Sequence, residues 1–308
     1  MTYDASLLPP ADVSERCAAH AERLELDPGG SALWVDELIV VDVPLPWPKP
    51  VWAKDGFTAV PELVLDAETA GRRVRVLAAV PLADGIGRVV VHRLVDGASL
   101  ARAEHHVAPD RVGDLLTALL VDGPDAEPAS VVDRTPQREL LLCTQGSHDV
   151  CCGSRGAALC AQLADRGWTS VRRVSHTGGH RMAPTGLTLP DGRMWGMVSA
   201  DEMMAILHHS APPSSLAHRC RGWIGAAPGV AQMAERAAFA EADDWGFDEQ
   251  RRTVAVVDGS AVVAAPSGSW GVEVEPGRAV PTIACGAPGG LPAKPGAEWL
   301  VRSISRTG

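Results

Sequence analysis

Short apolar runs separated by turn-forming residues follow one another along the first half of this chain. The runs ELIVVDV (37–43) and RVRVLAAV are rich in valine, as buried strands are, and the stretch from Pro61 to Arg73 between them predicts a helix. The segment GRVVVHRLVDGASLARAEHHV predicts a hairpin that turns at Asp96-Gly97. A further helix is predicted over 109–121. The order is therefore strand, helix, strand, hairpin, helix.

The second half of the chain repeats this order. The pattern predicts a strand in ELLLCT (139–144), a helix over 154–166 with Ser154 as its N-cap, and a strand in TSVRRVS. A hairpin in GLTLPDGRMWGMV turns at Asp191-Gly192, and a helix over 200–209 follows. The repetition predicts that one unit was duplicated. Because this is the element order of the thioredoxin-like fold, we expect an α/β protein of two thioredoxin-like domains in tandem.

The domain boundaries follow from a segment without periodicity, VDGPDAEPASVVDRTPQR (121–138), which is the best linker candidate. We expect a degenerate thioredoxin-like domain without ligands over 1–125 and a second thioredoxin-like domain over 138–210. Residues 211–308 are expected to form an extension packed on the second domain. An unrelated α+β first domain is the alternative.

Composition and charge exclude some kinds of partner and favour others. With 28 Lys and Arg against 38 Asp and Glu, the net charge of -10 argues against nucleic acid and anionic membranes as partners. The start of the chain lacks the features of a secretory signal, and no apolar run reaches about 20 residues, so we expect a cytoplasmic protein. The cysteine count of 7 is odd, and three cysteines lie within 143–152. This pattern favours metal or redox chemistry over a disulfide framework.

Two cysteines and two histidines form the candidate site. His176 and His180 flank two glycines in RRVSHTGGHRMAPT, which makes this segment a loop, since two glycines cost a helix about 2 kcal/mol. Cys143 and Cys152 both lie in the predicted strand-to-helix loop, with a C-x8-C spacing that lacks the close pair of a C-x-x-C redox motif. Two thiolates and two imidazoles suit zinc or an iron–sulfur cluster. Eight intervening residues exceed the usual spacing of structural zinc cysteines, which favours the cluster.

Three motifs together resemble the sucrase/ferredoxin-like family: LLLCTQGSHDVCCGSRG, SHTGGHRMAPTGLTLPDG and the upstream VDVPLPWP. Members of this family resemble thioredoxin-like ferredoxins that hold a 2Fe-2S cluster through two Cys and two His. The resemblance covers Cys17 to about Cys285 and is densest over 139–200. It implies that Cys143, Cys152, His176 and His180 are the cluster ligands.

The resemblance also implies roles for a few neighbours of these residues. Cys151 is not expected to be a ligand, although it is the obvious substitute for Cys152. His148 stands where the family often has arginine, and Pro184 falls where thioredoxin-like proteins carry a cis-proline. Cys17 and Cys285 recur in the family pattern, but no chemistry can be assigned to them.

The function expected from these residues is a 2Fe-2S electron carrier or redox sensor, without a catalytic cycle of its own. Its partner would be a redox protein, either a reductase or an acceptor. Two alternatives stay open: a thiol-dependent oxidoreductase that uses Cys143 or Cys152 as the attacking thiolate, and a protein with a structural zinc site.

Overall fold

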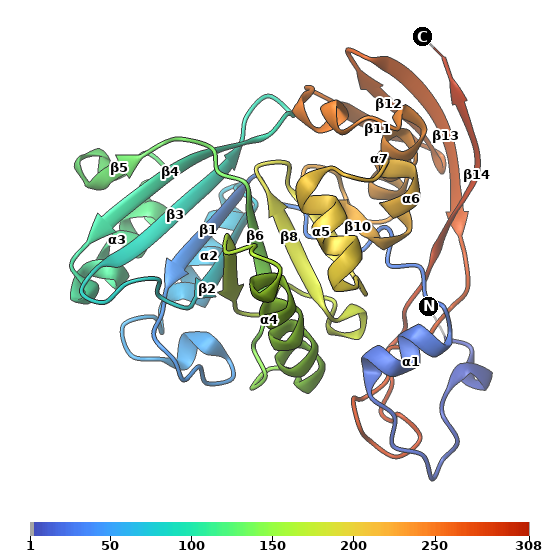
Figure 1. Ribbon diagram of the computed structural model, residues 1–308, viewed down its shortest axis with the longest axis horizontal. Coiled ribbons are helices and arrows are strands. Elements are labelled where there is room, and N and C mark those ends of the chain that lie inside the picture. Colours follow the sequence, from blue (N-terminus) through green and yellow to red (C-terminus); the bar gives the residue numbers. More distant parts are fainter. Residues whose placement is uncertain (1–2, 308) are drawn as a thin grey trace.

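The computed structural model describes residues 3–307 as a mixed α/β protein, which confirms the predicted fold class (Figure 1). In the first unit β1 pairs in parallel with β2 and antiparallel with β3, and β3 pairs antiparallel with β4. Its elements are β1 (Glu37–Asp42), α2 (Val60–Thr69), β2 (Val74–Ala79), β3 (Gly87–Leu94), β4 (Leu100–Val107) and α3 (Val112–Val121).

The second unit has the same element order and the same strand pairing. Here β6 pairs in parallel with β7 and antiparallel with β8, and β8 pairs antiparallel with β9. Its elements are β6 (Glu139–Cys143), α4 (Ala157–Asp165), β7 (Val171–Val174), β8 (Thr185–Leu189), β9 (Arg193–Gly196) and α5 (Ala200–His208). The internal repetition predicted from the sequence is therefore present in the strand topology, whereas the thioredoxin-like nature of both units stays a prediction.

The two units share one sheet, because β2 and β7 pair antiparallel at Ala79 and Val174. Two short strands extend this sheet at its ends, namely β5 (Val131–Asp133) beside β4 and β10 (Cys220–Trp223) beside β9. The resulting 10-stranded sheet has the order β10-β9-β8-β6-β7-β2-β1-β3-β4-β5. The segment predicted as a linker, 121–138, thus contributes an edge strand.

The strands after β10 build a second, 4-stranded sheet with the order β11-β12-β13-β14. These strands are β11 (Thr253–Val257), β12 (Ser260–Ala265), β13 (Gly268–Pro276) and β14 (Trp299–Arg306). The α-helices that follow α5 are α6 (Pro213–Leu216) and α7 (Val230–Ala242). In Figure 1, α7 lies between the small sheet and the second unit.

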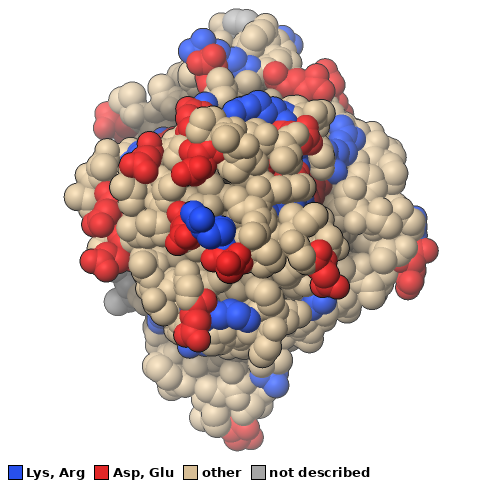
Figure 2. Space-filling model, turned by 90° about the vertical axis from the view of Figure 1, so that its left-hand side faces the viewer, with Lys and Arg blue, Asp and Glu red and all other residues tan. Residues whose placement is uncertain are grey.

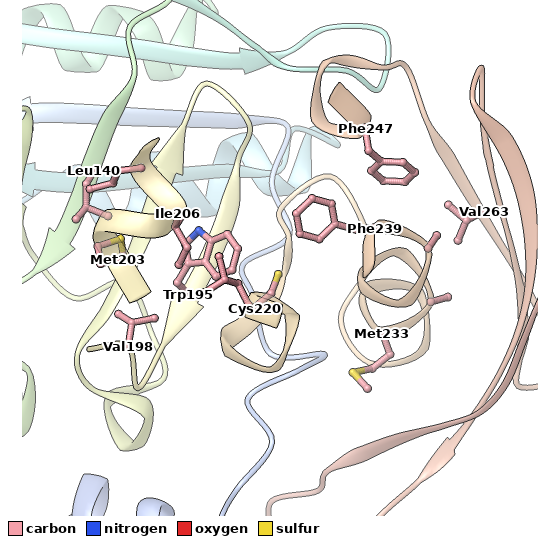
Figure 3. Packing of buried hydrophobic residues seen from close by; sticks show 14 of the residues in the cluster. Leu140, Trp195, Val198, Met203, Ile206, Cys220, Met233, Phe239, Phe247 and Val263 are labelled. Atoms are coloured by element: carbon pink, nitrogen blue, oxygen red, sulfur yellow. The ribbon is translucent and has the colours of Figure 1, made fainter. Parts of the chain in front are cut away.

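The alternation of strand side chains distributes the core over both faces of the large sheet. Leu140 and Leu142 pack toward a core that also contains residues of α4, α5 and α7, whereas Leu141 belongs to the core of the opposite face. Figure 3 shows Trp195 among the side chains of the core that contains Leu140. Phe239 and Phe247 lie in the same core, on the side of the small sheet. This continuous core joins the small sheet to the second unit.

A buried network of charges strengthens the same junction. Arg193 lies 2.8 Å from Glu235 and 2.6 Å from Asp248, and Arg252 lies 2.8 Å from Glu235. All four side chains are almost fully buried. Because each charge has an opposite partner, the network avoids the large cost of an unpaired buried ion.

The N-terminal segment and the segment 277–298 meet beside the second unit. The N-terminal segment carries α1 (Cys17–Arg23), and Ser14 forms a β-bridge with Pro288 of the segment 277–298. The Gly286 N–H donates to Glu15 O at 2.8 Å, and the Gly289 N–H donates to Val13 O at 2.9 Å. Figure 1 shows these two segments side by side at the end of the molecule where α1 lies.

Charged groups of both signs are interspersed on the face in Figure 2, which is the side of the molecule where β5 and α3 lie. Although the net charge of the chain is -10, this face does not carry charges of one sign alone. Among the described residues, no helix has the length and apolar character required to cross a membrane.

Candidate metal centre

Cys143 and Cys152 lie where strand β6 passes into the helix that leads to α4. Cys143 is the last residue of β6, and Cys152 begins a π-helical turn, Cys152–Gly156, that runs directly into α4. A side chain at Gly156 would bring its Cβ within 2.1 Å of Cys143 O, so only glycine lets the helix start so close to the strand. The two sulfurs are buried side by side as a result.

The predicted N-cap Ser154 is wrong. Ser154 lies inside the π-helical turn, and its hydroxyl donates to Val150 O at 2.8 Å. The helical conformation already begins at Val150, and Asp149 Oδ1 accepts from the Cys151 N–H at 2.8 Å. Asp149 therefore performs the capping role that the sequence pattern assigned to Ser154.

The loop from Ser175 to Pro184 carries both histidines, and contacts from distant elements hold it. The His176 N–H donates to Gln145 Oε1 at 3.1 Å, and Arg75 Nη2 donates to His176 O at 2.7 Å. The peptide bond between Ala183 and Pro184 is cis, as the sequence predicted.

Arg221 of β10 supports the glycine pair of this loop. Its Nη1 donates to Gly178 O at 3.1 Å and to Thr185 Oγ1 at 2.8 Å. Gly179 has φ +71°, and a Cβ there would lie 2.6 Å from Arg221 Nη2. Sequence reasoning missed Arg221, because its neighbourhood has no motif and only the pairing of β10 with β9 brings it under the loop.

Cys143, Cys152 and His176 offer three donor atoms that all lie within 4.8 Å of one another. Both cysteines are buried, and His176 is partly exposed. Among the described residues, the buried Nδ1 of His176 has no hydrogen-bond partner. The structure thus gathers three of the four predicted ligand residues into a group suited to a metal ion.

The fourth predicted residue, His180, lies beside this group and faces other partners. The centroids of the His176 and His180 rings are 6.4 Å apart. His180 Nδ1 lies 3.0 Å from Asp149 Oδ2 and 3.1 Å from Cys17 Sγ. The Nδ1 atom of His180 is therefore directed to a carboxylate and a thiol outside the three-residue group.

The electrostatics of the site favour a thiolate at Cys143. A hydrogen bond from Cys152, with a further one from His176, holds the pKa of Cys143 well below its usual range, although burial acts in the opposite direction. The same hydrogen bond and burial raise the pKa of Cys152. Burial also lowers the pKa of Arg221 to about 10, while the nearby Cys152 and Cys143 sulfurs favour its charged form. The positive charge of the Arg221 guanidinium therefore offsets negative charge on the two sulfurs.

His148 stacks on His176, with ring centroids 3.8 Å apart and an angle of 21° between the planes. Burial, followed by the charges of His176 and Lys49, lowers the pKa of His148 to about 4. The side chain at this position is thus a neutral neighbour of the site near pH 7.

A second group of donors lies next to the first, and it comprises Cys17, Asp149, Cys151 and Cys285. The Cys151 sulfur lies 3.5 Å from the Cys17 sulfur and 3.5 Å from the Cys285 sulfur. Cys151 therefore belongs to a group of its own and does not lie with Cys143. Sequence reasoning missed this group, because its cysteines stand far apart at positions 17, 151 and 285. The recurrence of Cys17 and Cys285 in the family pattern was the one available signal.

Fold and donor groups define a mixed α/β protein with a candidate Cys/His metal centre. A family model described as sucrase/ferredoxin-like matches residues 72–222, which include Cys143, Cys152, His176 and His180. This match confirms the resemblance to the sucrase/ferredoxin-like family seen in the sequence. Neither the curated proteins nor the solved structures contain a match.

Proposed function

We propose that this protein binds one 2Fe-2S cluster through Cys143, Cys152, His176 and His180 and serves as a one-electron carrier or redox sensor. The observation that carries the proposal is the meeting of Cys143, Cys152 and His176 donor atoms within 4.8 Å, with His180 four residues further along the same glycine loop. Thiolates and imidazoles are the ligands by which proteins hold such clusters.

The surroundings of the donors fit this group. His176 forms a hydrogen bond with the Cys143 sulfur, so one of its ring nitrogens already faces the buried thiols. Backbone N–H groups of Thr177 and Gln145 donate to the Cys143 sulfur. Hydrogen bonds to sulfur are among the features that set the potential of iron–sulfur centres.

Asp149 gives His180 an orientation suited to a ligand. Metal-binding histidines commonly donate their other ring N–H to a carboxylate, which fixes the tautomer and the ring. Asp149 Oδ2 lies 3.0 Å from His180 Nδ1, which leaves Nε2 as the nitrogen that would bind metal. His180 would thus complete the ligand set from beside the three-residue group.

A bound cluster would supply reversible uptake of one electron, and its two neutral imidazole ligands place the potential above that of all-cysteine plant-type ferredoxins. The chain keeps water from the sulfurs, since Cys143 and Cys152 are buried. Arg221 places positive charge near them, which also favours the reduced form.

The histidine side is the expected route for electrons. His148, His176 and His180 are partly exposed, whereas both sulfurs are buried. A redox partner, reductase or acceptor, would dock over these histidines. Burial of the sulfurs also favours an electron carrier over a thiol-dependent oxidoreductase, because an attacking thiolate needs access to its substrate.

Anaerobic purification followed by visible absorption and by iron and sulfide analysis tests the proposal. We expect a coloured protein with about two irons and two acid-labile sulfides per chain. A His176→Cys variant should keep the iron but shift the spectrum and lower the potential, because a thiolate replaces an imidazole. A control variant, His218→Cys, changes an exposed histidine and should leave both unchanged. A colourless protein after reconstitution with iron and sulfide would overturn the proposal.

A further inference from the structure

Three cysteines that lie far apart in the sequence meet next to the candidate cluster site. Cys17 is the first residue of α1, Cys151 lies just before the π-helical turn, and Cys285 belongs to the segment 277–298. Cys17 and Cys151 are almost fully buried, and Cys285 is partly exposed. The Cys151 sulfur stands between the other two, at 3.5 Å from each.

The spacing of these donors suits one tetrahedral ion. Two thiolates bound to one zinc ion at about 2.3 Å lie about 3.8 Å apart at the tetrahedral angle. The observed sulfur separations of 3.5 Å are close to this value. Asp149 Oδ2 lies 3.9 Å from the Cys17 sulfur, and the four donor atoms all lie within 4.8 Å of one another. A disulfide would use only two of the three sulfurs and leave the third beside a carboxylate.

Backbone groups already point to these sulfurs as they do in metal–thiolate sites. The Cys17 N–H donates to the Cys285 sulfur at 3.4 Å, and the Ala18 N–H donates to the Cys151 sulfur. The Cys151 N–H fixes Asp149 through Oδ1, while His180 contacts the Oδ2 atom. A histidine that donates to a ligating carboxylate is a common outer contact of metal sites.

The hydrophobic cluster around this group is small, which makes a bound ion a useful addition to its stability. The cluster contains Cys17, Ala18, Cys143, Cys151, Cys152, Ala183 and Ile283. The segments 3–16 and 277–298 have little regular secondary structure. Structural metal ions contribute most to folding where the apolar core is too small to hold the chain.

We propose that Cys17, Cys151, Cys285 and Asp149 bind one structural Zn²⁺ ion that ties the N-terminal segment and the segment 277–298 to the second unit. The three thiols release their protons to water as the ion binds, and no electron is transferred. This site is separate from the cluster and does not depend on it. Asp149 lies between the two, because it faces Cys17 and also accepts from His180.

Element-specific analysis of the full-length protein, produced in medium with zinc and purified without chelators, tests this site. We expect about one zinc per chain, in addition to any iron, and a zinc X-ray absorption spectrum with about three sulfur neighbours and one oxygen. Cys285→Ser should lower the zinc content about tenfold while iron and visible absorption persist. Cys160→Ser changes a cysteine of α4 outside both groups and should lose neither metal.

Several results would overturn the zinc site. Wild-type protein with iron but without zinc excludes it, as does a disulfide between two of the three cysteines in unreduced protein. Zinc with two sulfur and two nitrogen neighbours would place the ion at Cys143 and Cys152, and the cluster proposal would fail as well. Because the wild-type measurements are independent of any variant, poor folding of Cys285→Ser would not obscure the answer.

Discussion

Cys151 and Cys152 are adjacent in the chain, yet their sulfurs belong to different groups. The Cys151 sulfur lies 3.5 Å from those of Cys17 and Cys285, whereas Cys152 lies with Cys143 and His176. Successive residues of a helix point about 100° apart, so a Cys-Cys pair at a helix start reaches two sites at once. We therefore propose that one cysteine of the pair binds a structural ion and that the other binds the cluster.

Separate substitution of the two cysteines should distinguish their roles. Cys152→Ser should lose the visible absorption and most of the iron, because it removes a proposed cluster ligand. Cys151→Ser should keep both and lose zinc. Metal analysis and absorption spectra of the two variants check this prediction, and loss of iron from Cys151→Ser alone would contradict it.

The two glycines between the histidines should differ in their tolerance of alanine. Both have positive φ, which costs alanine about 1–2 kcal/mol. A Cβ at Gly178 meets open space, whereas one at Gly179 would lie 2.6 Å from Arg221 Nη2. Gly179→Ala should therefore be less stable than Gly178→Ala by about a further 1–3 kcal/mol.

Urea unfolding of the two glycine variants, followed by loss of visible absorption, measures this difference. Gly178→Ala is the matched control, since it carries the same backbone strain without the collision. Equal midpoints for the two variants would show that Arg221 does not support the loop as described.

His148→Arg should raise the potential of the centre. The new guanidinium can stack on His176 as the imidazole does, at 3.8 Å, but it adds a positive charge that stabilises the reduced cluster. The expected increase is on the order of tens of millivolts and should shrink as salt is added. Potentiometric titration measures it, with His218→Arg as a control at an exposed site. A lowered potential would refute the electrostatic argument.

His92 of β3 should make the protein less stable in mild acid. Burial, aided by the charges of Arg102, Arg88 and Arg172, lowers its pKa to about 3 from 6.5. Between these values the unfolded chain binds a proton that the folded chain does not, so stability is fully present above pH 6.5 and falls with decreasing pH. At pH 5 the loss amounts to about 2 kcal/mol.

Unfolding free energies at pH 7 and pH 5 measure this contribution. His92→Gln should reduce the loss between the two pH values, whereas His106→Gln, which changes a more exposed histidine of β4, should retain it. An identical loss in wild type and His92→Gln would contradict the assignment.

Local pattern predicted much of this architecture. Valine-rich runs, two Asp-Gly turns and the repeated order located the strands of both units, because these features depend on neighbouring residues. The start of the helix after Cys143 was misjudged, since Gly156 allows a π-helical turn that Asp149 caps. The C-x8-C and H-x3-H spacings pointed to the three residues of the first donor group, with His180 beside it.

Local sequence patterns could not predict the second donor group. Cys17, Cys151 and Cys285 meet only because the N-terminal segment and the segment 277–298 pair with each other and pack beside the second unit. The support of the histidine loop by Arg221 likewise depends on a strand that joins the sheet after α5. Both are products of tertiary structure, which spacing along the chain does not encode.

Pulsed electron paramagnetic resonance of the dithionite-reduced protein tests the central claim most directly. The account predicts a paramagnetic reduced 2Fe-2S cluster with strong couplings to two directly bound nitrogens, one of which disappears in His176→Cys. A reduced cluster without such nitrogen couplings would contradict histidine ligation. An absence of any cluster signal in reconstituted protein would contradict the electron-carrier function itself.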